Sequence, residues 1–279
     1  MTEGVEAAVR LLLAFALAWV GKLVYGLFTP AARIDREVTA RDNPAFAVPL
    51  GAYYLGILVV MGAPMSGTPG AGPVRDLVAV AAWGLLAIVL LNLAALANRA
   101  LLFRGLDLRA EILERRNLAA GYLAGGSHLA NALLVLGALG DEGGLGPAAA
   151  FWLYAQALLF VAVRTFLGLV RYDLAAEIRR GNQAVGLSVA GLLVALGNVL
   201  RLAVSGSFEG WSAAFAATTG YALVGLVLLF AARWLTDWIL LPGVTIRQEV
   251  VEQATPNVGV AWLEAAFYVG ASILVGWAL

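Results

Sequence analysis

Eight stretches of mostly apolar residues, each about 20 residues or longer, are spread along this sequence. A helix needs about 20 such residues to cross the hydrocarbon core of a bilayer. The composition agrees, because 62% of the residues are hydrophobic and only 13% are charged, against roughly 25% charged in a soluble domain. The pattern predicts an all-α membrane protein of about eight transmembrane helices. The predicted spans are Val5–Phe28, Pro44–Gly62, Leu77–Phe103, Leu118–Leu139, Pro147–Val170, Gln183–Val204, Trp211–Leu241 and Val258–Leu279.

The composition also excludes several classes of function. Lys+Arg and Asp+Glu are equal at 18 each, so no basic excess indicates a nucleic-acid partner. The absence of cysteine removes disulfides, thiolate metal sites and cysteine nucleophiles. The single histidine, His128, cannot form a multi-histidine metal site. Phosphate-binding, dinucleotide-binding and zinc-protease motifs are missing from the sequence. We therefore expect neither an enzyme nor a bound cofactor or metal.

The first apolar stretch is predicted to be a retained helix rather than a cleaved export signal. A signal peptide begins with a basic segment, but here Glu3 and Glu6 precede Arg10. The apolar run also continues past Lys22 to Phe28, which is longer than a signal peptide requires.

Four of the connections between the spans are rich in arginine and resemble one another. Each has a glutamate four residues after its start, an aliphatic residue next, another aliphatic four positions before that one, and a closing asparagine. They read RIDREVTARDN (Arg33–Asn43), DLRAEILERRN (Asp107–Asn117), DLAAEIRRGN (Asp173–Asn182) and TIRQEVVEQATPN (Thr245–Asn257). The glutamates are Glu37, Glu111, Glu177 and Glu249, and the asparagines are Asn43, Asn117, Asn182 and Asn257. A period of about 65 to 75 residues indicates an internal repeat.

The repeat is a two-helix unit that occurs four times, over residues 1–62, 75–140, 147–205 and 211–279 of one membrane domain. Aliphatic residues four apart make an apolar stripe on a helix, so each arginine-rich segment predicts a short helix in the membrane interface. Asp107, Asp173 and Thr245 are expected to cap these short helices, whereas Arg33 occupies that position in the first unit. The closing asparagine is expected to cap the following span.

Small residues recur on the second helix of each unit. They lie four and eight residues after the closing asparagine, and such residues let helices approach closely in lipid. We therefore expect the second helices to be the contact surfaces between units. The residues at the first of these positions are Ala47, Gly121, Gly186 and Ala261, and those at the second are Gly51, Gly125, Ala190 and Ala265.

The arginines predict the orientation in the membrane. Because cytoplasmic loops carry an excess of Lys and Arg, the four segments are expected inside and both termini outside the cytoplasm. All four units then insert as parallel copies. The arginines of the segments and their margins are Arg33, Arg36, Arg41, Arg104, Arg109, Arg115, Arg116, Arg171, Arg179, Arg180 and Arg247, whereas the opposite side has Arg10, Arg75 and Arg201.

Each unit has two spans around a D-x-x-x-E-(I/V)…N segment, and the second span is a helix of small residues. This unit resembles the bacterial family called domain of unknown function 350, the YjfL-like inner-membrane proteins. The resemblance covers nearly the whole chain as four tandem copies, and the second and third fit best. Unit four departs from the pattern, with Thr245 for the aspartate and an insertion before Asn257. The resemblance implies a bacterial inner-membrane location and brings no known activity and no catalytic residues.

Charged residues inside the spans are the strongest candidates for function, because they are costly in a bilayer. The first helix of each unit has one basic residue near its end, where it either extends to the interface or pairs with a repeat glutamate. These residues are Lys22, Arg99, Arg164 and Arg233. Glu264 is the exceptional acid, with Arg233 at the matching depth. It forms either a structural ion pair, a protonated hydrogen-bond donor or a relay for protons or cations.

Other polar residues permit two interpretations each. His128 and Asn131 are expected to form a polar patch near the middle of the membrane, which either bridges helices or belongs to a transport path. Gln156 and Asn198 are similar isolated cases. The four repeat glutamates either are solvated or bonded to neighbouring arginines, or form an acidic ring that selects cations.

Two hypotheses of function follow. In the first, the units surround a polar path, and the protein is a channel or transporter for a small cation or a proton. In the second, it is a non-transporting scaffold or stress-response module whose arginine-rich segments recruit a cytoplasmic protein or bind anionic lipids. The partners expected are the lipid bilayer, a further copy of the chain in a homo-oligomer, and a cytoplasmic protein.

Overall fold

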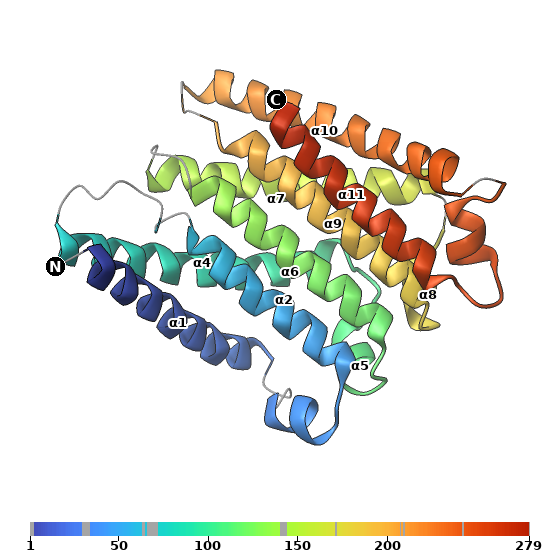
Figure 1. Ribbon diagram of the computed structural model, residues 1–279, viewed down its shortest axis with the longest axis horizontal. Coiled ribbons are helices and arrows are strands. Elements are labelled where there is room, and N and C mark those ends of the chain that lie inside the picture. Colours follow the sequence, from blue (N-terminus) through green and yellow to red (C-terminus); the bar gives the residue numbers. More distant parts are fainter. Residues whose placement is uncertain are drawn as a thin grey trace.

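The fold consists of long helices joined at one end by short ones (Figure 1). The computed structural model describes residues 3–29, 34–62, 65, 72–139, 144–170, 172–206, 208, 210–241 and 243–278. The described residues contain helices and no strand, which confirms the all-α prediction. The long helices are α1 (Glu3–Phe28), α2 (Pro44–Val60), α4 (Pro73–Leu101), α6 (Leu118–Leu139), α7 (Leu145–Val170), α9 (Gln183–Val204), α10 (Trp211–Leu240) and α11 (Val258–Ala278).

Short helices occupy the arginine-rich segments, as the aliphatic spacing predicts. Two are α-helices and two are π-helices, and the π-form lies in the first and last units: η1 (Asp35–Ala40), α5 (Leu108–Leu113), α8 (Leu174–Arg179) and η2 (Gln248–Glu252). The aliphatic stripe of α5 and α8 is buried against the bundle. Arg33 and Arg171 of these segments lie outside the described residues. We call each combination of two long helices and the short helix between them a unit, numbered one to four.

Seven of the long helices are long and apolar enough to cross a membrane. The remaining one, α2, is apolar but has only 17 residues. The helix bounds otherwise follow the apolar stretches closely. The main difference is α4, which begins at Pro73 instead of Leu77, because proline is favoured in the first turn of a helix. Its first turn includes Asp76, which lies 3.8 Å from Arg10 of α1.

The second helices of the units form a row, in the order α2, α6, α9 and α11 (Figure 1). Glycines bring their backbones together, since a Cβ added at Gly121 would lie 2.6 Å from the Ala45 carbonyl oxygen. A Cβ at Gly186 would lie 2.5 Å from the Ala119 carbonyl oxygen. Both glycines were expected at contact surfaces. Gly51 is different, because it is exposed and its added Cβ would meet nothing within 4 Å.

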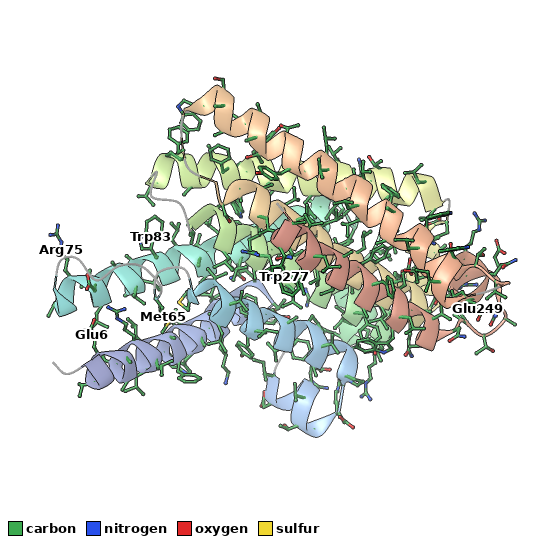
Figure 2. The ribbon with its side chains drawn as sticks, turned by 45° about the horizontal axis from the view of Figure 1, so that its top comes forward. Glu6, Met65, Arg75, Trp83, Glu249 and Trp277 are labelled. Atoms are coloured by element: carbon green, nitrogen blue, oxygen red, sulfur yellow. The ribbon has the colours of Figure 1, made fainter. Side chains whose placement is uncertain are left out.

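The first helices of the units pack against this row, and their outward faces are apolar. Large side chains such as Leu27 and Trp238 are 78% and 70% exposed. Apolar surface of this extent suits a lipid environment. The two ends of the bundle differ in chemistry. Glu249 and the other residues of the short helices lie at one end, and Glu6 and Arg75 lie at the other (Figure 2).

Candidate functional site

A hydrogen-bonded glutamate and asparagine recur in every arginine-rich segment, and we call this arrangement the Glu–Asn latch. The asparagine Nδ2 donates to the glutamate carboxylate, and the asparagine main-chain N–H donates to the glutamate main-chain carbonyl. Because both bonds join the same two residues, the latch fixes where the short helix ends and the next long helix begins. The four latches are Glu37–Asn43, Glu111–Asn117, Glu177–Asn182 and Glu249–Asn257.

The latch glutamates of units one to three are buried and paired with arginine. Their residues are 3%, 5% and 9% exposed, in chain order. The ion pairs are Glu37–Arg41, Glu111–Arg115 and Glu177–Arg180. This placement agrees with the salt-bridged interpretation, because an acidic ring would require exposed carboxylates. Glu249 is partly exposed and accepts from Gln253 as well as Asn257.

The latch asparagines of units one to three also reach into the following unit. Each side-chain amide donates to the main-chain carbonyl of the aliphatic residue that follows the next latch glutamate. These bonds run from Asn43 to Ile112 (3.0 Å), from Asn117 to Ile178 (2.5 Å) and from Asn182 to Val250 (2.9 Å). One amide therefore joins two latches, so the short helices form a continuous hydrogen-bonded chain across the bundle.

The fourth unit ends this series of hydrogen bonds. Asn257 bonds Glu249 of its own unit, and it is exposed, whereas the asparagines of units one to three are buried. Among the described residues, no main-chain carbonyl of another unit accepts from its amide.

The predicted helix caps are mostly confirmed. Asp107 and Asp173 accept from the main-chain N–H of Ala110 and Ala176, and the Thr245 hydroxyl accepts from Gln248. The closing asparagine caps the next long helix in units two to four. The prediction is wrong for Asn43. The Phe46 N–H bonds the main-chain carbonyl of Asn43 instead, and the side-chain Oδ1 has no partner in the described part of the chain.

The residue before the latch asparagine has a left-handed backbone in the first three units. These residues are Asp42 (φ 45°), Arg116 (φ 51°) and Gly181 (φ 81°). Only glycine adopts this conformation without cost, so two of the three turns contain a strained residue. The turn lets the asparagine face back toward its glutamate.

Glu264 forms the ion pair with Arg233 that their matching depth predicts. Its residue is fully buried, and its carboxylate also accepts from Ser188 of α9 and from the Tyr268 hydroxyl at 2.8 Å. The Arg233 guanidinium lies over the ring of Phe166, with 5.6 Å to the centroid. The carboxylate therefore has three donors from three helices. These bonds join α9, α10 and α11 at one buried carboxylate.

Tyr172 lies next to this cluster, in the link between α7 and α8. Burial, and after it the Glu264 carboxylate, raise the pKa of the Tyr172 phenol above its ordinary value. The phenol is therefore neutral at physiological pH and adds no charge to the cluster.

A second polar cluster joins α4, α6 and α7 inside the bundle. The Asn98 amide donates to Ser127 and to Asn131 Oδ1 at 3.0 and 3.1 Å, and Gln156 donates to the same Asn131 oxygen at 3.3 Å. Asn131 Nδ2 and Gln156 Oε1 are buried and have no partner among the described residues. The predicted patch of His128 with Asn131 is not formed in this way, because His128 packs instead beside the rings of Tyr25 and Tyr53.

The other basic residues of the first helices behave differently from Arg233. Lys22, Arg99 and Arg164 are exposed, and none of them is within 4.0 Å of a carboxylate of the described residues. Arg99 lines a pocket between units one and two, together with Tyr25, Ala124 and His128. His128 Nδ1 is buried and without a partner in the described structure.

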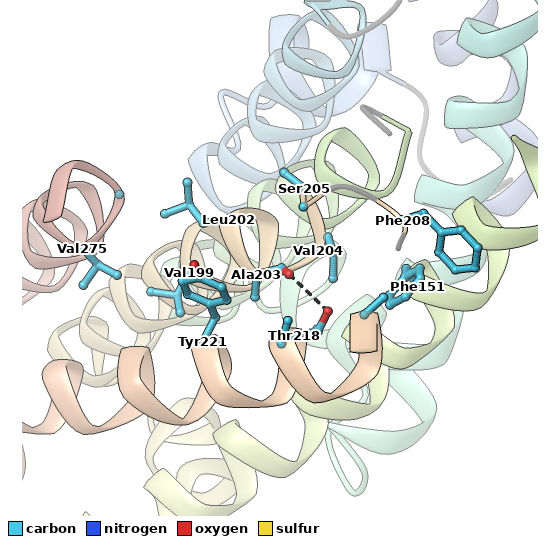
Figure 3. Close-up of a pocket in the computed structure, with 14 residues that line it drawn as sticks. Phe151, Val199, Leu202, Ala203, Val204, Ser205, Phe208, Thr218, Tyr221 and Val275 are labelled. Atoms are coloured by element: carbon cyan, nitrogen blue, oxygen red, sulfur yellow. Dashed lines mark hydrogen bonds between the residues drawn. The ribbon is translucent and has the colours of Figure 1, made fainter. Parts of the chain in front are cut away.

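An apolar pocket lies at the opposite end, between α7, α9, α10 and α11 (Figure 3). Its walls include Phe151, Val199 and Tyr221, and the Thr218 hydroxyl in it already donates to the Ala203 carbonyl at 3.1 Å. Ligand sites combine apolar walls with a few convergent polar groups. Among the described residues, no charged side chain lines this pocket.

The arrangement gives no evidence for metal chemistry in the described residues, where no three His, Asp or Glu side chains gather. Sequence reasoning missed Asn98, Ser188 and Tyr268. Asn98 precedes Arg99 directly, so its polar side chain inside an apolar span was a usable signal. Ser188 and Tyr268 carried no signal, because serine and tyrosine are common in membrane helices.

The family model described as Domain of Unknown Function (DUF350) matches residues 1–139 and 142–279. No curated protein and no solved structure matches the chain. Each matched segment contains two units, so the matches divide the chain into two segments, and the four tandem copies expected from the resemblance stay a prediction.

Proposed function

Because the chain belongs to the family described as Domain of Unknown Function (DUF350), whose description names no activity, we propose a function from the geometry: a non-transporting membrane scaffold that recruits a cytoplasmic protein. The chain crosses the bacterial inner membrane eight times, as four parallel two-helix units, with α2 as the eighth span. A helix of 17 residues is at the short end of the range for a span.

The packing of the central row supports this proposal most directly. Gly121 and Gly186 place the backbones of α2, α6 and α9 in contact, which leaves no room for a water-filled path between these helices. Glu264, the sharpest candidate for a cation or proton path, accepts from three donors and lines none of the pockets described above. A rigid row of this kind is well suited to hold a surface in a fixed shape.

The arginine-rich end supplies that surface. The latches bury three glutamates, so their arginine partners are partly neutralised while further arginines are exposed. A cytoplasmic location of this end follows the positive-inside rule and places both termini outside the cytoplasm. We expect the partner to present acidic side chains to these arginines. Besides the exposed latch partners Arg115 and Arg180, the exposed arginines of this end are Arg36, Arg104, Arg109, Arg116, Arg179 and Arg247, of which Arg247 pairs with Glu252.

A photo-crosslinking amino acid placed at Arg109 or Arg180 in living cells tests the proposal. The expected result is one and the same crosslinked protein from both positions, lost when Arg179 and Arg247 are changed to Gln. Substitution of Arg75, at the opposite end of the bundle, is the matched control and should yield no such product. Absence of a common product would contradict the scaffold.

The series of hydrogen bonds between latches ends open at unit four, and this open end supports a homo-oligomer. Asn257 is exposed at one end of the row, and the Val38 carbonyl, which corresponds to the acceptors Ile112 and Ile178, lies in unit one. If two copies of the protein lie side by side, Asn257 of one copy can donate to the Val38 carbonyl of the other, as the latch asparagines do between units. Cysteines placed at Val38 and Asn257 should crosslink between chains in the membrane. A purely monomeric product would refute this association.

A small-cation or proton channel is the second candidate, and the Asn98–Asn131–Gln156 cluster favours it. Asn131 Nδ2 and Gln156 Oε1 are buried polar groups without partners in the described structure, and such groups are costly in a membrane. The test is dissipation of a pH or sodium gradient in liposomes. A flux that Asn131→Leu or Glu264→Gln changes would support the channel and contradict the scaffold.

A further inference from the structure

The ion-pair cluster of unit four has a counterpart in unit two in which the carboxylate is missing. Glu264 and Tyr268 are seven and eleven residues after the latch asparagine Asn257, and Ala124 and His128 are at the same distances after Asn117. Arg233 and Arg99 are the basic residues near the latch end of the first helices of these two units. The two family matches bring the same units into correspondence, since each match begins with an odd-numbered unit.

The surroundings of the two places correspond as well. In unit four, Phe166 from the preceding unit packs against Tyr268 with 6.0 Å between ring centroids. In unit two, Tyr25 from the preceding unit packs against His128 with 6.4 Å between ring centroids. Both places therefore have an aromatic ring from the preceding unit as a wall, whereas the Glu264 carboxylate of unit four is replaced by the methyl group of Ala124 in unit two.

Because unit two has no carboxylate at this place, its hydrogen-bond donors lack the acceptor that Glu264 provides in unit four. Arg99 has no carboxylate within 4.0 Å in the described structure, and His128 Nδ1 is buried without a partner. Both residues, with Ala124, line the pocket between units one and two. A buried polar atom such as His128 Nδ1 rarely lacks a partner in proteins, and an anionic ligand would pair with it and with the exposed Arg99 guanidinium.

We propose that this pocket binds the carboxylate of a long-chain fatty acid from the lipid phase, in the position that Glu264 occupies in unit four. The rest of the pocket is mostly apolar, with Phe46, Phe103 and Ile112 among its walls, and its mouth opens to the surroundings of the helices. Arg109 of the short helix α5 lies at the same pocket and adds a second positive charge. Apolar walls with a few charged groups are typical of a site for an amphiphile.

The carboxylate of the fatty acid accepts hydrogen bonds from the Arg99 guanidinium and from His128, in the tautomer that carries the ring proton on Nδ1. The acyl chain lies along the apolar walls. This site goes beyond the scaffold function and does not depend on it.

Binding of tritiated palmitate to the full chain in phosphatidylcholine nanodiscs tests the site. Arg99→Gln should weaken binding about tenfold or more, because it removes a charge-assisted hydrogen bond. Ala124→Glu should abolish binding, because the new carboxylate would occupy the place of the ligand. Lys22→Gln is the matched control, since it removes an exposed basic residue from α1 that does not line the pocket. It should leave the affinity unchanged.

Two competition experiments identify the chemistry of the ligand. Acetate should not compete with palmitate, and phosphatidylglycerol in the disc should not displace it. Competition by acetate would overturn the role of the acyl chain, and displacement by phosphatidylglycerol would overturn the carboxylate in favour of a lipid phosphate. Wild-type affinity in both Arg99→Gln and Ala124→Glu would overturn the site itself. If Ala124→Glu does not fold, as judged from its thermal unfolding, His128→Leu takes its place and should weaken binding as Arg99→Gln does.

Discussion

The side-chain amide of Asn117 donates to the main-chain carbonyl of Ile178, which lies 61 residues further along the chain. The same amide donates to Glu111 in its own unit. A single side chain thus closes its own short helix and holds the next one. This relationship explains why the latch asparagines are buried in the first three units and why the position must supply two N–H donors.

Asn117→Ala is expected to lower the free energy of unfolding by about 3 kcal/mol, because it leaves the buried Glu111 carboxylate and the Ile178 carbonyl short of a donor. Asn257→Ala should cost about 1 kcal/mol or less, because Asn257 is exposed and bonds only within its own unit. Denaturation in mixed detergent micelles measures both. Equal costs would contradict the role of the bond between units.

The left-handed residue before the latch asparagine of units one to three allows two substitutions with opposite expected effects on stability. Gly181→Ala should destabilise the protein by about 1 kcal/mol, and Arg116→Gly should stabilise it by a similar amount, since only glycine adopts a positive φ freely. The midpoint of thermal unfolding in detergent checks both changes. Shifts of the same sign in the two variants would show that the turn is not the cause.

Removal of one partner from the buried ion pair should be costly. Arg233→Gln is expected to lower the free energy of unfolding by about 3 to 5 kcal/mol, because Glu264 is fully buried and then lacks its counter-charge. The double variant Arg233→Gln with Glu264→Gln should recover part of that loss. A double-mutant cycle measures the coupling. Strict additivity would mean that the two side chains do not interact.

The close approach of the central helices is tested at glycine. Gly186→Val should disrupt the contact of α6 with α9 and reduce the yield of folded protein severely, because the first added carbon would lie 2.5 Å from the Ala119 carbonyl oxygen. Gly51→Val is the matched control on α2, where nothing lies within 4 Å of the added carbon. Size-exclusion profiles of the two variants give the comparison. A folded, monodisperse Gly186→Val protein would contradict the packing.

Much of this fold could be predicted from the sequence, because the patterns involved are local. Apolar length gives the long helices, and the spacing of Leu108 and Ile112 gives a short helix between two of them. The pairing of Arg233 with Glu264 could also be predicted, since both charges lie at one depth and a bilayer offers neither of them water.

The rest depends on the lateral order and rotation of the helices, which no local pattern contains. The bond from Asn117 to Ile178 requires that α6 and α9 are neighbours, and the sequence identifies Asn117 only as a helix cap. His128 and Asn131 are one turn apart, yet α6 directs them to different neighbours: the ring of Tyr25 and the amide of Asn98. The π-helical form of η1 and η2 also has no signal in their charged residues.

In the described part of the protein, the hydrogen bonds between latches link each unit to the next, and none returns to the first unit. The length of this series is therefore not fixed by ring closure, in contrast to a barrel. A duplication of one segment such as 142–279 would add further links of the same kind and would leave every existing bond in place. Growth by whole segments, without redesign of the interior, is the evolutionary route that such an open-ended array allows.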